Sequence, residues 1–439
     1  MPQTKIIVLD DDPTGSQTVH GCLLLTRWDT DTLRAALADA APLFFVLTNT
    51  RGMDATQAAE VTRTVSRNLK NVLDELARAD SHINPILVSR SDSTLRGHYP
   101  VETDVIAQEL GPFDAHFLVP AFFEGGRITR DSVHYLMVNG KPVPVHETEF
   151  ARDSVFGYTH SYLPDYVEEK THGGIKAATV QRFLLDAVRG DCLDRLLQLH
   201  GNTCCVVDAE TQSDLDNFCH QLRAATARGK RFLFRSAASL LTSLANLGPQ
   251  PVAAADMRQF TRAARAGAVI VGSHVTKTTQ QLEQLLKQPD VLALEVEVNR
   301  IDGEGPALLM EVLATARNAH AAGLTPVIYT SRAEKAFADR KTRLAFGERV
   351  SAFLMQVVRG LPPTLGFLIS KGGITSNDVL SSGLRLKTAR VLGQILPGCS
   401  VVCCPQDHPR YPAMPVVIFP GNVGDENGLA TVYRRLSVQ

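Results

Sequence analysis

Short runs of apolar and β-branched residues alternate with longer stretches of helical periodicity along the first half of the chain. This alternation is typical of a parallel sheet whose helices cover its two faces. Strands are predicted at 5–9, 43–48, 84–89, 115–119, 204–208 and 231–234. The clearest helix is predicted from Asp54, a suitable N-cap, to about Ala79, because apolar residues recur there at helical spacing.

A second series of the same kind follows a Gly-, Pro- and Ala-rich stretch at 247–256. Strands are predicted at 268–273, 291–298, 325–331, 365–370 and 415–420, and helices at 276–287, 304–322, 341–359 and 427–436. The segment 139–175 is rich in Pro, Gly, His and aromatic residues, and we interpret it as an insertion or lid. The pattern predicts two Rossmann-like α/β domains, 1–248 and 257–439, with mostly parallel sheets and a cleft between them.

Length and charge narrow the class of protein. The 439 residues exceed the ~250–300 at which a single hydrophobic core stops growing, so two or three domains are expected. Lys and Arg number 45 against 46 Asp and Glu, which leaves no broad basic field for nucleic acid or an anionic membrane. No apolar run approaches the ~20 residues that cross a bilayer, and the N-terminus is expected to be a first strand and not a signal peptide.

The cysteines indicate a reducing compartment. None of the eight forms a C-x-x-C motif, and the adjacent pairs at 204–205 and 403–404 lie in apolar runs. Cysteine in such runs usually behaves as a small buried hydrophobe. A cytoplasmic location is therefore expected.

Charged and hydroxyl side chains follow the first four predicted strands. Ligands of open α/β sheets bind beyond the carboxyl ends of the strands. Each of these turns alone could be a capped, solvated turn, but four in succession favour a binding rim. Arginines there can grip planar anions, hydroxyls can bond sugar hydroxyls, and carboxylates can take a proton or hold a cation. The rim comprises Asp11, Asp12, Arg51, Arg90, Ser91, Asp92, Ser93, Thr94, Arg96 and Arg127, and it suits a small polyhydroxylated acid.

The second domain carries glycine-bearing loops between a strand and a helix, at 372–375 and 421–424. Such loops can bring backbone N–H groups against phosphates, and Ser273 could contact the same ligand where another helix starts. Neither loop is a G-x-x-x-x-G-K-[ST] motif, and G-x-G-x-x-G is absent from the sequence. Each loop alone could simply turn the chain. Together they favour a nucleotide site in the second domain.

Six segments, in this order, resemble the four-carbon acid sugar kinase family, formerly catalogued as a domain of unknown function. They are LDDDPTGSQ, SRSDSTLRG, PAFFEGGRIT, VGSHVTKTTQQ, KGGITS and FPGNVG. The resemblance implies an N-terminal acid-sugar domain and a C-terminal nucleotide domain. It also implies ATP-dependent phosphorylation of a terminal hydroxyl on an acid such as threonate, erythronate or 3-oxo-tetronate.

Carried over residue by residue, the resemblance places the acid sugar at Asp11, Asp12, Arg51 and Asp92 through Gly97. It places the nucleotide at Ser273, at Gly372, Gly373, Ile374 and Thr375, and at Gly421, Asn422, Val423 and Gly424. Mg²⁺ would bridge the phosphates, with ligands left unassigned. We expect Arg51 and Arg96 to anchor the carboxylate, and Asp12, in preference to Asp92, to accept the hydroxyl proton. An N-cap or an ion pair with Arg96 is the alternative role for Asp92.

Two other functions stay open at this point. A dehydrogenase or isomerase acting on a similar acid would need a dinucleotide fingerprint, and the first loop, DDDPTG, lacks those glycines. A non-catalytic sensor of sugar acids could keep the arginine rim but would not need two glycine loops. The expected partners are an acid sugar and ATP, with no nucleic acid and no membrane, and self-association into a homo-oligomer is left open.

Overall fold

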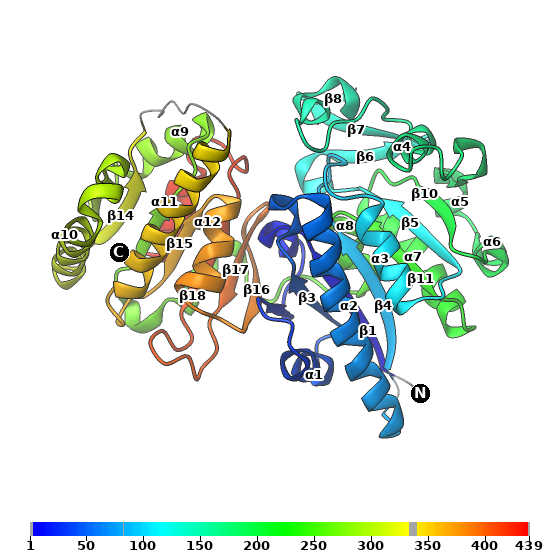
Figure 1. The fold of residues 1–439 in the computed structure, drawn as a ribbon, viewed down its shortest axis with the longest axis horizontal. Helices are drawn as coiled ribbons and strands as arrows, with labels where there is room; N and C mark the ends of the chain where they lie inside the picture. The colour runs from blue at the N-terminus through cyan, green and yellow to red at the C-terminus, as the bar shows by residue number, and fades with distance from the viewer. Residues whose placement is uncertain (1–2, 82, 333–339, 438–439) are drawn as a thin grey trace. The chain divides into compact units, whose positions relative to one another are not determined.

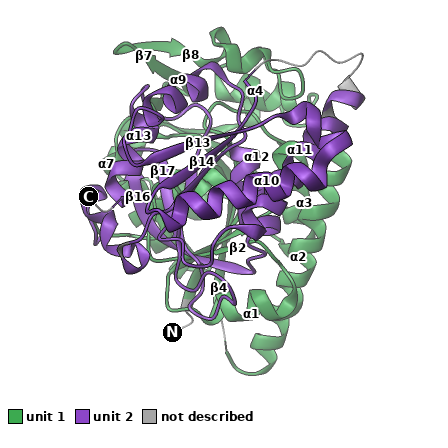
Figure 2. Ribbon diagram, turned by 90° about the vertical axis from the view of Figure 1, so that its left-hand side faces the viewer, with its two compact units in different colours: residues 1–249 green, residues 250–439 purple. Residues whose placement is uncertain are grey.

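The apolar runs of the first half form an all-parallel sheet, with strand order β2-β3-β1-β4-β11-β5-β10-β9. The computed structural model describes residues 3–81, 83–332 and 340–437 (Figure 1). This sheet belongs to the first of two units, Met1–Pro249, which is distinguished from Gln250–Gln439 in Figure 2. Its strands are β1 Gln3–Asp10, β2 Leu23–Leu25, β3 Leu43–Leu47, β4 Ile83–Arg90, β5 Ala115–Val119, β9 Gln181–Phe183, β10 Thr203–Val207 and β11 Phe232–Ser236.

Helices cover both faces of this sheet. Apolar side chains of α1 (Thr30–Ala38), α2 (Ala55–Arg78) and α3 (Val101–Leu110) share one buried cluster with β1, β3 and β4. On α7 (Gln212–Ala227), Phe218 packs edge-on against Phe117 of β5. The shorter helices are α5 Leu185–Arg189, α6 Leu193–Gln198 and α8 Ser239–Leu244. The predicted start of α2 is confirmed, because Asp54 closes a reciprocal capping box with Gln57.

Between β5 and β10 the chain leaves the sheet and builds an accessory layer (Figure 1). A small antiparallel sheet, β6-β7-β8, is followed by two 3₁₀ turns and a short helix. The elements are β6 Arg127–Arg130, β7 Val133–Val138, β8 Lys141–Pro144, η4 Val145–Glu147, η5 Glu149–Arg152 and α4 Leu163–Lys170. The predicted insertion at 139–175 thus lies within a layer that already begins at Arg127.

The second unit has a mixed sheet of order β13-β14-β12-β15-β18-β17-β16. Its first five strands are parallel, and β17 runs antiparallel to β18 and β16. The strands are β12 Ala268–Val271, β13 Val291–Val296, β14 Thr325–Thr330, β15 Leu368–Lys371, β16 Thr388–Leu396, β17 Cys399–Cys403 and β18 Pro415–Phe419. The helices are α9 Thr276–Leu285, α10 Ile301–Ala321, α11 Arg340–Gly360, α12 Gly373–Asp378 and α13 Gly428–Leu436. The predicted α/β class with mostly parallel sheets is confirmed.

The structure also shows the state of the cysteines and the character of the helices. All eight cysteines are free thiols, and only Cys403 is more than slightly accessible. Among the helices that the structure describes, none combines the length and apolar character needed to span a membrane.

Candidate active site

Three adjacent strands bring the first group of candidate residues together. In the sheet, β1 lies between β3 and β4, and Asp10 is level with Leu47 on one side and with Arg90 on the other. The residues that follow these three positions therefore emerge at the same edge. They are Asp11 and Asp12 after β1, Arg51 in the 3₁₀ turn η2 (Thr50–Gly52) after β3, and the loop Ser91–Gly97 after β4.

Asp11 is the buried centre of this group, with only 1% of its surface exposed. Arg51 clasps it through two hydrogen bonds, from Nη2 to Oδ1 at 2.5 Å and from Nε to Oδ2 at 3.2 Å. The Ser91 hydroxyl donates to Asp11 Oδ2 at 2.7 Å. Since both oxygens are engaged, Asp11 fixes Arg51 and the start of the β4 loop and is poorly placed to take a proton.

Asp12 is more open, with 21% of its side chain exposed. Its Oδ1 accepts from the Thr14 backbone N–H at 2.8 Å and from the Thr14 hydroxyl at 2.5 Å, which caps the 3₁₀ turn η1 (Pro13–Ser16). Its Oδ2 lies 3.7 Å from Nη1 of Arg51. Burial acts to raise the pKa of Asp12, but Arg51 and Arg90 outweigh it and the net pKa is lowered. Asp12 is therefore an ionised carboxylate at neutral pH.

Asp92 forms the ion pair that the sequence left as its alternative role. Its Oδ2 accepts from Arg96 Nε at 2.6 Å and from the Thr94 hydroxyl at 2.5 Å. Burial acts to raise the pKa of Asp92, but the positive charges of Arg51 and Arg96 lower it by more than burial raises it. Its net pKa is therefore well below the ordinary value. The side chain is 13% exposed, less than that of Asp12.

A buried layer beneath the rim includes two residues that sequence reasoning missed. Arg235 of β11 donates to Glu102 Oε2 at 2.6 Å and to the Ser91 hydroxyl at 2.8 Å. Glu102 of α3 also accepts from the Thr50 hydroxyl at 2.5 Å. The signal available was a single arginine inside the apolar run FLFRS, because a charge in a central strand must be paired.

Gly97 lets the loop close over this layer. Its φ is +119°, and a β-carbon at this position would lie 2.3 Å from Ser91 Oγ and 2.7 Å from Arg235 Nη2. A side chain there would need both a rare backbone conformation and the displacement of buried polar atoms. The glycine of the DSTLRG segment is thus required by close approach.

The remaining rim residues are Arg127 and Ser93. Arg127 begins β6, donates to the Gly125 carbonyl and lies 5.9 Å from the Phe122 ring centroid. Its buried Nε has no hydrogen-bond partner among the described residues. The Ser93 carbonyl lies 2.8 Å from Nε2 of His134, so this residue helps to fix the loop through its backbone.

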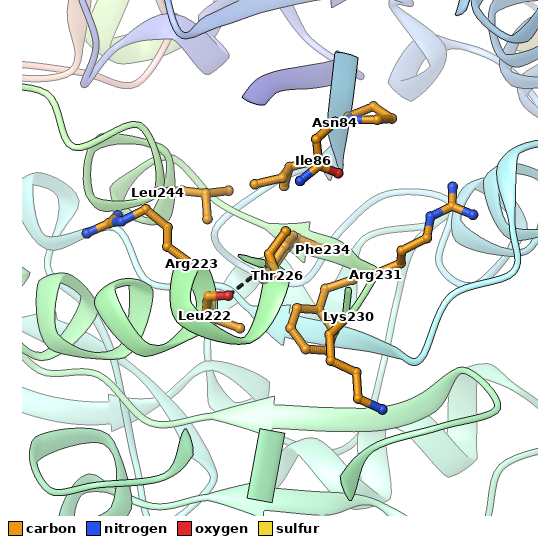
Figure 3. A pocket seen from close by; sticks show the side chains of 11 residues that line it. Asn84, Ile86, Leu222, Arg223, Thr226, Lys230, Arg231, Phe234 and Leu244 are labelled. Carbon is orange, nitrogen blue, oxygen red and sulfur yellow. Dashed lines mark hydrogen bonds between the residues drawn. The ribbon is translucent and has the colours of Figure 1, made fainter. Parts of the chain in front are cut away.

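Figure 3 shows a different pocket, at the opposite ends of the strands. It lies at the starts of β4 and β11, where Asn84 and Ile86 face Phe234. The nearby cations are engaged by backbone carbonyls, Arg223 by Ser243 and Lys230 by Leu199. It holds no group of convergent carboxylates, so we do not assign a ligand to it.

In the second unit, the loops after β12, β15 and β18 converge on Ser273. The Ser273 hydroxyl accepts from Thr278 at 3.1 Å, and a β-carbon on Gly421 would lie 3.7 Å from it. A β-carbon on Gly372 would lie 3.1 Å from the Ser273 β-carbon, and the φ of Gly372 is +118°. The predicted nucleotide residues of the three loops are thus brought together around Ser273, and a β-carbon on Gly421 would be in ordinary contact with Ser273 and Val275.

The other residues of these loops differ in exposure and in hydrogen bonding. Ile374 is the most exposed large apolar side chain among the described residues, at 74%. Gly373 starts α12, and the Thr375 hydroxyl lies beside Gly272. The second loop is held by Gln281, whose amide donates to the carbonyls of Val423 at 2.9 Å and Asp425 at 2.7 Å. The Asn422 carbonyl accepts from Lys277 at 3.4 Å, and Gly424 has a positive φ of 78°.

Lys371 links the two glycine loops and was given no role from the sequence. Its ammonium is fully buried and donates to the carbonyls of Pro420 at 2.5 Å and Gly421 at 3.1 Å. It lies 4.1 Å from the Phe419 ring centroid. Burial lowers the pKa of Lys371 to about 7. The contact ties the end of β15 to the loop after β18.

The groups around Ser273 and Gly421 are of a kind that fits phosphate better than a metal ion held by protein side chains. The backbone N–H groups of a glycine-bearing loop and a serine hydroxyl are donors of the kind that bind phosphate oxygens, and the loop at Gly421 and Ser273 lie together here. Within the described ranges, no group of three His, Cys, Asp or Glu side chains is arranged to hold a metal ion. Mg²⁺ commonly keeps several waters and binds mainly through substrate phosphates, so such a cluster is not needed for it.

Two families of known domains match successive parts of the chain. A family described as a sugar-binding N-terminal domain matches residues 6–244, and one described as a nucleotide-binding C-terminal domain matches 268–429. A D-erythronate kinase from Heliobacterium modesticaldum (strain ATCC 51547 / Ice1) is 29% identical over 229 residues, 49% of this chain and 48% of that protein. The chain thus spans about half the length of the curated relative it matches.

Two solved structures share the fold over almost the whole chain. A protein from Salmonella typhimurium LT2, provisionally described as a tRNA synthase, has a TM-score of 0.72 at 18% identity and covers 99% of this chain and 100% of its own. A Haemophilus influenzae protein of the family DUF1537 has a TM-score of 0.65 at 17% identity, with 98% and 100% covered. At these identities the likeness establishes the architecture alone.

Proposed function

This chain belongs to the four-carbon acid sugar kinase family, and from that premise we propose that it is an ATP-dependent kinase acting on the terminal hydroxyl of a four-carbon acid sugar. Threonate, erythronate and 3-oxo-tetronate are the candidate acceptors. Erythronate is the first to test, because the matched relative is described as a D-erythronate kinase.

One observation carries the proposal. Within the part of the chain that matches a sugar-binding domain, two charged groups lie at the carboxyl ends of three strands, Asp11, Asp12 and Arg51 in one and Asp92 and Arg96 in the other. The Ser91 hydroxyl joins them, because it lies within hydrogen-bond distance of both Asp11 Oδ2 and the Arg96 carbonyl. Charged groups that hold one another in place in this way offer a preorganised surface to a small polar ligand. An apolar ligand would gain nothing from it.

The ion pairs indicate that the arginines of the rim have different roles. Arg51 is occupied by Asp11, and Arg96 by Asp92, so these two shape the loops as well as contributing positive charge. Arg127 has no carboxylate ion-pair partner within 4 Å in the described structure, and its Nε is free. We therefore infer that Arg127 makes the strongest contact with the substrate carboxylate, with Arg51 and Arg96 beside it.

Proton transfer is assigned to Asp12. It is ionised and more exposed than Asp92, and among the described residues its Oδ2 has only the 3.7 Å contact to Arg51. A carboxylate of this kind can accept the proton of the attacking hydroxyl as the bond to phosphorus forms. Asp11, Ser91, Ser93 and Thr94 complete the acid-binding rim.

On the nucleotide side, Ser273 and the loops Gly372–Thr375 and Gly421–Gly424 would hold the phosphates of ATP. Mg²⁺, bound with the nucleotide, would neutralise phosphate charge during transfer. Transfer requires the terminal phosphate of ATP to meet the hydroxyl of the acid.

The proposal is tested by measuring ADP release from ATP and Mg²⁺ across a panel of four-carbon acids, with the products identified by mass. We expect acid-dependent ADP formation and a product heavier by one phosphoryl group. Oxidation of the acid with NAD would instead support a dehydrogenase. Stabilisation of the protein by an acid, without turnover, would support a sensor.

A further inference from the structure

The loop Asp92–Gly97 holds a backbone conformation that its own sequence does not favour. Leu95 has a φ of +65°, in the left-handed region that branched side chains rarely adopt, and its side chain is 7% exposed. Gly97 also has a positive φ, of 119°. Such conformations persist only where the surroundings impose them, and they concentrate at functional sites.

The restraint comes from residues 145–170 of the accessory layer, which we call the clamp segment. The Tyr158 hydroxyl donates to the Thr94 carbonyl at 2.7 Å, and the Tyr166 hydroxyl donates to the Leu95 carbonyl at 2.8 Å. The two tyrosine rings are buried and meet edge-to-face, with centroids 5.7 Å apart. Burial raises the pKa of each phenol, so both stay protonated and can donate.

The clamp segment also reaches the charged end of the loop. Asp153 Oδ2 lies 3.7 Å from Nη1 of Arg96, and the guanidinium carbon of Arg96 lies 4.9 Å from the Phe150 ring centroid. Just beyond the loop, His98 meets Phe156 edge-to-face at 4.9 Å. The clamp segment therefore holds both the backbone of the loop Asp92–Gly97 and the side chain of Arg96.

We propose that Tyr158 and Tyr166 are positioning residues for acid recognition, and that the clamp segment sets which acid the enzyme prefers. The inference rests on the proposed function, because it takes the loop Asp92–Gly97 as the acid-binding loop. Each hydroxyl fixes a carbonyl of the strained turn between Asp92 and Arg96. A small rotation of that turn would move both side chains relative to the bound acid.

The test uses Tyr158→Phe, Tyr166→Phe and the double variant in the full-length protein, with Tyr162→Phe as the matched control. Tyr162 lies in the same segment, but its ring packs on Arg182 at 5.4 Å. A buried hydrogen bond of this kind supports an expected rise of about three- to tenfold in the KM for the acid in each single variant, and more in the double variant. The KM for ATP should stay unchanged, and the ratio of kcat/KM between two acids should shift.

Hydrogen exchange of the amides at 94–97, measured without ligand, shows whether the clamp segment restrains the loop, and it does not depend on activity. We expect faster exchange in the double variant and unchanged exchange in Tyr162→Phe. Unchanged exchange in the double variant would overturn the clamp, whatever the activity. Faster exchange with an unaltered KM for the acid, or with parallel changes in both KM values, would overturn its role in recognition. A wild-type protein that phosphorylates none of the acids would overturn the proposed function instead.

Discussion

At the scale of single residues, neighbouring carboxylates of the first unit have unequal numbers of hydrogen-bond and ion-pair partners. Asp11 is saturated by Arg51 and Ser91, whereas Asp12 keeps one oxygen with only a long contact. The two neighbouring carboxylates thus have different surroundings, and the proposed function gives Asp11 a structural role and Asp12 a chemical one.

Asp12→Asn is expected to lower kcat by about 10²–10⁴-fold while leaving ATP binding intact, because asparagine keeps the cap on Thr14 but cannot take a proton. Steady-state kinetics and a nucleotide titration would measure the two effects. Asp29→Asn is the matched control, since Asp29 caps α1 through the backbone and hydroxyl of Thr32 in the same manner. Turnover equal to that of the wild type would remove Asp12 from the role of base.

His134 predicts how stability depends on pH. It is buried between the Thr129 hydroxyl at 2.9 Å and the Ser93 carbonyl at 2.8 Å, and burial lowers its pKa to about 4. The unfolded chain takes up a proton near pH 6.5 and the folded chain does not. The stability that His134 contributes is therefore full above pH 6.5 and is lost as the pH falls through 4, by about 2 kcal/mol at pH 5.

Urea unfolding followed by the fluorescence of Trp28, the single tryptophan of the chain, reports on this unit. The loss of stability between pH 7 and pH 5 should be smaller in His134→Gln than in the wild type. Equal losses in the two proteins would show that His134 titrates normally in the folded state.

At the scale of elements, the sequence was most informative where periodicity was long or apolar runs were continuous. The helix α2 begins one residue after its predicted cap, and β5 matches its predicted bounds. The strand β2 has only three residues, and β16 alternates buried and half-buried positions next to irregular pairing, so neither gave a clear run.

The sequence also predicted only part of the candidate site. Residues that follow strands in recognisable motifs could be predicted, and the structure brings them together. The arginine in FLFRS was a signal for a buried charge at Arg235, but its partner Glu102 could not be predicted, because the pair joins β11 to α3 across 133 residues of sequence. The ion pair of Arg51 with Asp11 also depends on the tertiary fold, whereas that of Arg96 with Asp92 spans four residues and was the alternative role predicted for Asp92.

Gly97→Ala tests how tightly the β4 loop is built. The new β-carbon would meet Ser91 Oγ at 2.3 Å, so we expect at least a tenfold weaker affinity for the acid together with a lower melting temperature. Gly21→Ala is the control, because Gly21 also has a positive φ but a β-carbon there would meet no atom within 4 Å. It should lose about 1–2 kcal/mol of stability and no affinity. Equal affinities of the two variants would argue against close packing at Gly97.

At the scale of the whole molecule, the two units are expected to bind different ligands. In hydrogen exchange on the full chain, an acid substrate should protect amides at 91–97, and ADP with Mg²⁺ should protect those at 372–375 and 421–424. The reason is that each ligand orders the loops it touches and leaves the other sheet as it was. Protection of 91–97 by ADP alone would reverse the assignment of the two units.

The accessory layer has a consequence for engineering and for divergence among relatives. It is spliced between β5 and β10, neighbouring strands that pair with each other without it. On the proposed function, residues 145–170 can be varied in a library that keeps their buried side chains, while the parallel scaffold and the carboxylates that follow its strands stay constant. New acceptor ranges should arise by rewriting this stretch sooner than by altering the strands that carry the chemistry.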